Sequence, residues 1–168
     1  MTNAVLPYMR ARRQGRIINV GSLAAWVGEP GETFYSASKH ALAGYTEALR
    51  HEVWPLRIHV SLVEPGPFET SVLDTSTIAA SAIADYDAVR QAAHHMLEES
   101  LRKGGNPRKV AHLISKTARE RSPRLRYGVG CASHWLPFLK VLLPQSLFDS
   151  ILRKAYGIVK NEAAPRQF

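Results

Sequence analysis

Three side chains of this sequence could together move a proton: Ser22, Tyr35 and Lys39. Tyr35 and Lys39 stand four residues apart in an expected helix, so their side chains share one face. A free phenol has a pKa near 10, too high for efficient proton exchange at neutral pH. A lysine ammonium about 6 Å away contributes roughly 3 kcal/mol at an effective dielectric of about 20, which lowers the pKa of the phenol toward about 8. With the Ser22 hydroxyl holding a substrate oxygen, these groups suit carbonyl–alcohol interconversion, in which Tyr35 passes the proton and a nicotinamide passes the hydride.

A strand, a helix and a second strand are expected to position these groups. The β-branched run at 16–21 predicts a buried strand that ends just before Ser22, and the pattern at 34–54 predicts a helix that Pro55 closes. A second apolar strand is expected at 57–63, followed by Pro65-Gly66-Pro67. Such a βαβ unit implies a parallel sheet, whose ligands bind outside the carboxyl ends of the strands.

The rest of the chain is expected to be mostly helical. Residues 3–13 resemble the end of a helix stopped by Gly15, and a third strand is expected at 125–131. Further helices are expected at 86–103, at 107–120 and, interrupted by Pro137 and Pro144, at 134–159. We therefore expect a single α/β domain over 1–160 and a disordered tail over 161–168.

Three segments in fixed order resemble the short-chain dehydrogenase/reductase family, in particular its hydroxysteroid and retinol dehydrogenase-like members. They are Gly-Arg-Ile-Ile-Asn-Val-Gly-Ser at 15–22, Tyr-x-x-x-Lys at 35–39 and Pro-Gly-Pro-x-x-Thr at 65–70. Tyr-x-x-x-Lys alone is a weak signal, but all three together, correctly spaced, are a strong one. A looser likeness extends to Arg-Tyr-x-x-Gly at 126–130.

The resemblance implies roles for individual residues and a Rossmann-like parallel sheet with helices on both faces. Ser22, Tyr35 and Lys39 would be catalytic, with Tyr35 and Lys39 also contacting NAD or NADP. The backbone of Pro65, Gly66, Pro67 and Phe68 and the hydroxyl of Thr70 would hold the nicotinamide. Residues 71–105 and 23–34 would line the substrate, which we expect to be a small hydrophobic secondary alcohol or its ketone.

Segments that the family carries before its catalytic serine have no counterpart here. The glycine-rich Thr-Gly-x-x-x-Gly-x-Gly turn for the adenine-side phosphates is not found, nor are the Asn-Ala-Gly segment and the residue that chooses between NAD and NADP. We therefore expect the carboxy-terminal part of such a fold, amino-terminally truncated. The alternative function is a non-catalytic remnant or a partner-binding fragment of such an enzyme.

Composition restricts the other classes of protein. The chain has 168 residues, 45% hydrophobic and 21% charged, with 22 Lys and Arg against 14 Asp and Glu, a formal charge of +8. Its basic clusters lack interleaved aromatic residues, so nucleic-acid binding is not expected. The seven histidines show no metal-ligand spacing, so no metal is expected, although His94 and His95 could face a substrate pocket.

Location and association follow from smaller features. The single cysteine, Cys131, fits a reducing cytoplasm. Pro137 and Lys140 break the apolar run at 135–143, so it is not expected to span a bilayer. Such a run is more often core or a subunit contact than a membrane-lying helix, and we expect one of the former. A stripe of small residues on the expected helix at 34–54 suits close packing, so a homo-oligomer is expected and membrane association is not.

Overall fold

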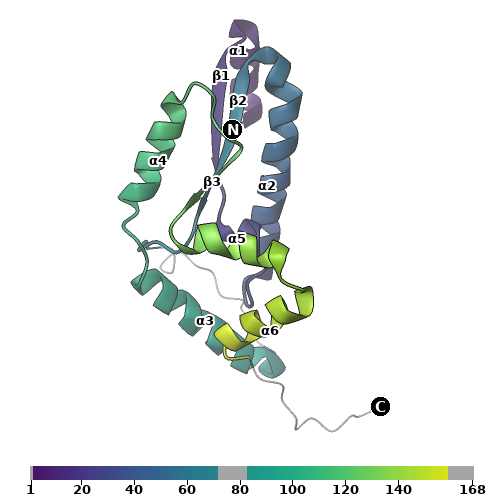
Figure 1. Cartoon of the computed structure of the whole chain (residues 1–168), viewed down its shortest axis with the longest axis vertical. Coiled ribbons are helices and arrows are strands. Elements are labelled where there is room, and N and C mark those ends of the chain that lie inside the picture. Colours follow the sequence, from purple (N-terminus) through teal and green to yellow (C-terminus); the bar gives the residue numbers. More distant parts are fainter. Residues whose placement is uncertain (1, 72–82, 159–168) are drawn as a thin grey trace.

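The computed structural model describes residues 2–71 and 83–158 and shows a three-stranded parallel sheet with helices on both faces (Figure 1). The strands are β1 (Gly15–Val20), β2 (Ile58–Pro65) and β3 (Arg126–Val129), in the order β1-β2-β3. Val20 of β1 pairs with Val63 of β2, so both strands end at the same edge of the sheet. The predicted fold class is confirmed.

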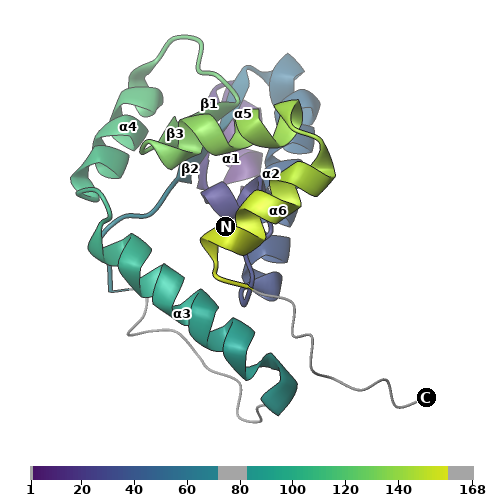
Figure 2. The same cartoon turned by 60° about the horizontal axis from the view of Figure 1, so that its bottom comes forward.

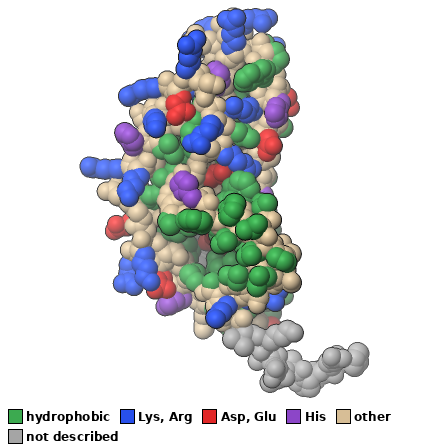
Figure 3. Space-filling model, in the orientation of Figure 1, with side chains coloured by type: hydrophobic (Ala, Val, Ile, Leu, Met, Phe, Trp, Pro, Cys, Tyr) green, Lys and Arg blue, Asp and Glu red, His purple; other side chains and the backbone are tan. Residues whose placement is uncertain are grey.

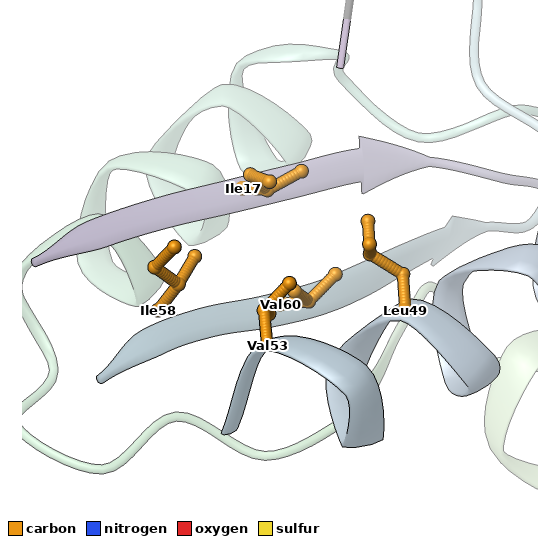
Figure 4. Close-up of a cluster of buried hydrophobic side chains, with 5 residues drawn as sticks. All are labelled: Ile17, Leu49, Val53, Ile58 and Val60. Carbon is orange, nitrogen blue, oxygen red and sulfur yellow. The ribbon is translucent and has the colours of Figure 1, made fainter. Parts of the chain in front are cut away.

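Two helices cover one face of the sheet. They are α1 (Thr2–Arg12) and α2 (Thr33–Val53), and α2 is followed by the short 3-10 turn η2 (Trp54–Leu56), which contains Pro55. Helix α1 packs Leu6 and Met9 against a core cluster formed by α2 and the strands, shown in Figure 4: Ile17, Leu49, Val53, Ile58 and Val60. Since α2 connects β1 to β2 and packs on both, the start of α2 is fixed over the carboxyl edge.

The opposite face is covered by α4 (Arg108–Arg119), which packs Val110, Leu113 and Ile114 against Val63 and Tyr127. The side chain of Arg16 in β1 donates to the carbonyl oxygen of Thr117 near the end of α4, at 2.9 Å. Alternate residues of the strands therefore face different helices, which is why apolar residues point to both faces of β1 and β2.

Three further helices gather near the carboxyl edge of the sheet (Figure 2). They are α3 (Asp87–Arg102), preceded by the 3-10 turn η4 (Ala84–Tyr86), α5 (Ala132–Leu142) and α6 (Gln145–Ala155). The 3-10 turn η1 (Leu23–Ala25) follows β1 at the same edge. Among the described residues, no helix is both long and apolar enough to cross a membrane.

Two local predictions were wrong. Gly15 does not end the first helix: Arg13 adopts the left-handed conformation that ends it, at φ 48°, and Gly15 begins β1. Glycine is needed at 15 for space, since a Cβ there would lie 2.5 Å from Met9 Sδ. Pro137 does not interrupt α5, which continues through it at the loss of one backbone hydrogen bond.

The other element predictions agree with the structure within a few residues. The division into one domain over 1–160 with a tail stays a prediction, and the tail lies outside the described residues. So does part of the expected substrate segment, at 72–82.

Candidate active site

Ser22 lies just beyond β1, where the chain leaves the sheet. The N–H of Gly21 donates to the carbonyl oxygen of Val63 at 2.8 Å, which extends the pairing with β2 to the residue before Ser22. The Ser22 Oγ accepts a hydrogen bond from the N–H of Ala24 at 3.1 Å and caps η1. Because this bond occupies the oxygen as an acceptor, the hydroxyl proton remains available to donate.

Tyr35 stands in the first turn of α2 and meets Ser22. The Ser22 hydroxyl lies close enough to the phenol to lower the pKa of Tyr35, so the serine stabilises the phenolate. Ser36 fixes the start of α2 to the preceding loop. Its side chain is 5% exposed, and its Oγ accepts a hydrogen bond from the N–H of Glu29 at 3.1 Å. Tyr35 itself stays 43% exposed and therefore open to a ligand.

Lys39 completes the group that the sequence predicts. Its Nζ lies 5.4 Å from the centroid of the Tyr35 ring and 3.5 Å from the carbonyl oxygen of Val20, at the end of β1. The structure thus brings Ser22, Tyr35 and Lys39 to the carboxyl edge of the sheet, two from one helix face and one from the loop after a strand.

The prediction that Lys39 lowers the pKa of the Tyr35 phenol is wrong for this structure. The pKa of Tyr35 is raised rather than lowered: burial is the largest cause, and the charges of Glu32 and Glu29 add to it, against the lowering by Ser22. Lys39 is held at a carbonyl oxygen in an exposed position, where water screens its charge.

Glu29 and Glu32 are the site residues that sequence reasoning missed. Burial and the neighbouring Glu32 raise the pKa of Glu29 to about 7. The signal was present, because both carboxylates stand in the turn that leads into Tyr35. They also act on Tyr156 at the end of α6, whose pKa is raised by burial and then by Glu29 and Glu32.

The predicted cofactor segment follows β2. Gly66 donates its N–H to the carbonyl oxygen of Val129 at 2.9 Å, and Glu69 donates to Gly105 at 3.2 Å. Phe68 is 6% exposed and belongs to the core, so only its backbone faces the edge, whereas Pro67 and Thr70 are exposed. The segment is therefore held by β3 and by the residues after α3.

An ion pair ties the walls of the site together. Glu64, near the end of β2, is 3% exposed and accepts from Arg126 of β3 at 3.1 Å. The Arg126 guanidinium lies 4.2 Å from the centroid of the Trp26 ring, and the Lys140 Nζ of α5 donates to the Trp26 carbonyl oxygen. The loop after Ser22 is thus anchored to β2, β3 and α5.

The fold and this grouping define an α/β protein with a serine, a tyrosine and a lysine gathered at the carboxyl edge of its parallel sheet. Comparison with known proteins agrees. The family model described as short chain dehydrogenase matches residues 1–81. This chain belongs to the short-chain dehydrogenase/reductase family.

Two curated relatives extend the likeness. The 3-ketodihydrosphingosine reductase of Bacteroides thetaiotaomicron is 38% identical over 94% of this chain and 60% of its own length. Human 17-beta-hydroxysteroid dehydrogenase type 1 is 30% identical over 97% of this chain and 52% of its own. The chain thus spans between half and two thirds of the length of these relatives.

Two solved structures share the fold. A short-chain dehydrogenase from Streptomyces avermitilis is 28% identical with a TM-score of 0.66, over 91% of this chain and 53% of that one. A short chain dehydrogenase from Burkholderia cenocepacia in complex with NADP is 26% identical with a TM-score of 0.57, over 90% of this chain and 53% of that one.

Proposed function

We propose that this chain supplies the proton-transfer centre of an NAD- or NADP-dependent oxidoreductase that interconverts a secondary alcohol and its ketone. The observation that carries the proposal is the grouping of three side chains: the Ser22 hydroxyl is close enough to Tyr35 to lower its pKa, and the Lys39 Nζ lies 5.4 Å from the centroid of the same ring. Each of the three groups has a separate task in this reaction.

Tyr35 moves the proton. In reduction its phenol gives a proton to the carbonyl oxygen while the carbonyl carbon receives a hydride, and in oxidation the phenolate takes the proton back. Ser22 donates its hydroxyl proton to the same oxygen and holds it beside the phenol. The bound nicotinamide supplies or accepts the hydride.

Lys39 and the segment after β2 fit the nicotinamide end of a dinucleotide. The Lys39 Nζ has a single acceptor at 3.5 Å, which leaves N–H donors for ribose hydroxyls. We assign the backbone of Pro65, Gly66, Pro67 and Phe68 and the hydroxyl of Thr70 to the nicotinamide itself. The Burkholderia cenocepacia neighbour was solved with NADP, which supports a cofactor of this class.

A small hydrophobic alcohol or ketone is the proposed substrate. The names of the two relatives specify a keto-sphingoid and a hydroxysteroid substrate, which supports this class. The small residues of α2 that we assign to a homo-oligomer contact are exposed: Ala37, Ala41, Gly44 and Ala48.

Titration of the purified chain with NADH and NADPH, followed by nicotinamide fluorescence, tests cofactor binding. Turnover of a panel of hydrophobic ketones then tests the chemistry. We expect saturable binding, and we expect Tyr35→Phe to lower kcat by roughly 100- to 10,000-fold, because the proton donor is lost.

Tyr45→Phe is the matched control. Tyr45 stands on the same helix and is 44% exposed, close to the 43% of Tyr35, so its variant should retain full turnover. Absence of binding at millimolar cofactor would instead favour a non-catalytic remnant. Equal turnover by both variants would refute the role of Tyr35.

A further inference from the structure

The outer side of α5 and α6 exposes a continuous set of large apolar side chains, here called the α5–α6 surface. Figure 3 shows them gathered over these two helices. Their exposed fractions run from 48% at Leu147 to 80% at Val141. The members are Trp135, Phe138, Val141, Leu142, Leu147 and Ile151.

Helical spacing explains why these residues face one way. Trp135, Phe138 and Leu142 follow one another at intervals of three and four residues on α5, and Leu147 and Ile151 are four apart on α6. The inner sides of both helices are already anchored, through Ser133 at 8% exposure and Phe148 at 4%. The apolar surface is therefore not a disrupted part of the core.

The two residues that break the apolar run in the sequence do not break this surface. Lys140 turns inward, where its Nζ donates to the carbonyl oxygen of Trp26. Pro137 is half-buried inside an unbroken helix. The folded helix thus separates its one lysine from its apolar face, which the linear sequence does not reveal.

Positive charge lies at one end of the surface, in the last turn of α6. Since Lys140 turns inward, the ionised side chains on the outer side of these helices are Arg153, Lys154 and Asp149. Asp149 is already engaged, since it accepts from Gln145 at 2.6 Å and from Arg153 at 3.5 Å. Arg153 and Lys154 are exposed at the last turn of α6, and His134 is exposed beside Trp135.

We propose that the α5–α6 surface binds peripherally to an anionic lipid bilayer, with the aromatic side chains at the level of the headgroups. Tryptophan and phenylalanine beside basic residues are typical of helices that lie in this interface.

The surface adjoins the candidate active site. Lys140 of α5 holds the loop that follows Ser22, and Tyr156 after α6 lies close enough to Glu29 and Glu32 for their charges to raise its pKa. Bilayer binding would thus place the site beside a lipid-dissolved substrate. This last step rests on the proposed function, whereas the binding of lipid does not.

Flotation of the full chain with vesicles tests the proposal. Phosphatidylcholine vesicles with and without phosphatidylserine are compared at low and high salt. We expect binding to the anionic vesicles that weakens with salt. Trp135→Ser combined with Phe138→Ser should weaken it roughly tenfold to a hundredfold, because two large apolar side chains leave the interface.

Trp54→Ser is the matched control, because Trp54 on η2 is 60% exposed and Trp135 is 62% exposed. Unchanged circular dichroism in both variants shows that the fold is retained. Loss of binding only in the Trp135 and Phe138 variant supports the proposal, and equal loss in both variants overturns it.

Two other outcomes also overturn the proposal. One is concentration-dependent self-association without vesicle binding, abolished by the Trp135 and Phe138 substitutions, which would assign the surface to a second copy. The other is absence of both behaviours. Since flotation needs no turnover, its result is independent of whether the chain proves catalytic.

Discussion

Tyr35 is subject to opposing influences that all come from its immediate neighbours. Ser22 stabilises the phenolate, while burial and the carboxylates of Glu29 and Glu32 stabilise the neutral phenol. The second set prevails, so the residue that we propose as proton donor is held in its protonated form.

Glu29 gives a prediction about stability. Its pKa is raised from 4.5 to about 7 in the folded chain, so between these values the folded state binds more protons than the unfolded state. The free energy of unfolding therefore falls as pH rises through this window. Glu29→Gln should remove the part of this decrease in the free energy of unfolding that comes from Glu29. The variant should therefore be more stable than the unsubstituted chain above about pH 7.

Urea denaturation below pH 4.5 and above pH 7 measures the effect. Glu47→Gln on the exposed side of α2 is the control and should leave the pH dependence unchanged. An identical pH dependence in Glu29→Gln and the unsubstituted chain would contradict the buried position assigned to this carboxylate.

At the scale of elements, the segment after β2 depends on a close approach by the end of α3. A Cβ at Gly104 would lie 2.7 Å from both Glu69 N and Phe68 C. Since these are backbone atoms, the segment must move to make room. The next residue, Gly105, forms an isolated β-bridge with Phe68.

Gly104→Ala is therefore expected to lower the free energy of unfolding by about 1–3 kcal/mol. It should also weaken cofactor binding, because it displaces the segment that we propose holds the nicotinamide. Gly28→Ala is the control, as its Cβ would meet nothing within 4 Å. Its effect should stay within about 0.5 kcal/mol. Chemical denaturation and cofactor titration measure both, and a Gly104→Ala chain of unchanged stability would contradict the close approach.

At the scale of the whole molecule, β2 is the central structural element. It is hydrogen-bonded to β1 on one side and to β3 on the other, and Val60, Leu62 and Val63 are fully buried. By contrast, α1 has no buried residue. Stability should therefore differ widely between these elements.

Hydrogen exchange followed by mass spectrometry should find the slowest amides in β2 and faster exchange in α1. The physical reason is that β2 amides open only when the sheet separates, whereas α1 can detach from one face. Equal protection of peptides from 2–12 and 58–65 would contradict this order.

The sequence by itself determined the βαβ unit and the place of the site. The apolar runs at 16–21 and 57–63, with a helical pattern between them, permit only a parallel pair with a crossover helix. A serine after the first strand and a tyrosine and lysine at the start of the helix then meet at one edge, as the structure confirms.

The tertiary structure alone decided the electrostatics and the exposed surfaces. The influence of Glu29 and Glu32 on Tyr156, and the inward turn of Lys140 toward Trp26, join residues far apart in the chain. Periodicity reports which residues share a face of an element, but not which neighbour that face meets. Those contacts help to raise the pKa of Tyr156 and leave the apolar side of α5 and α6 exposed.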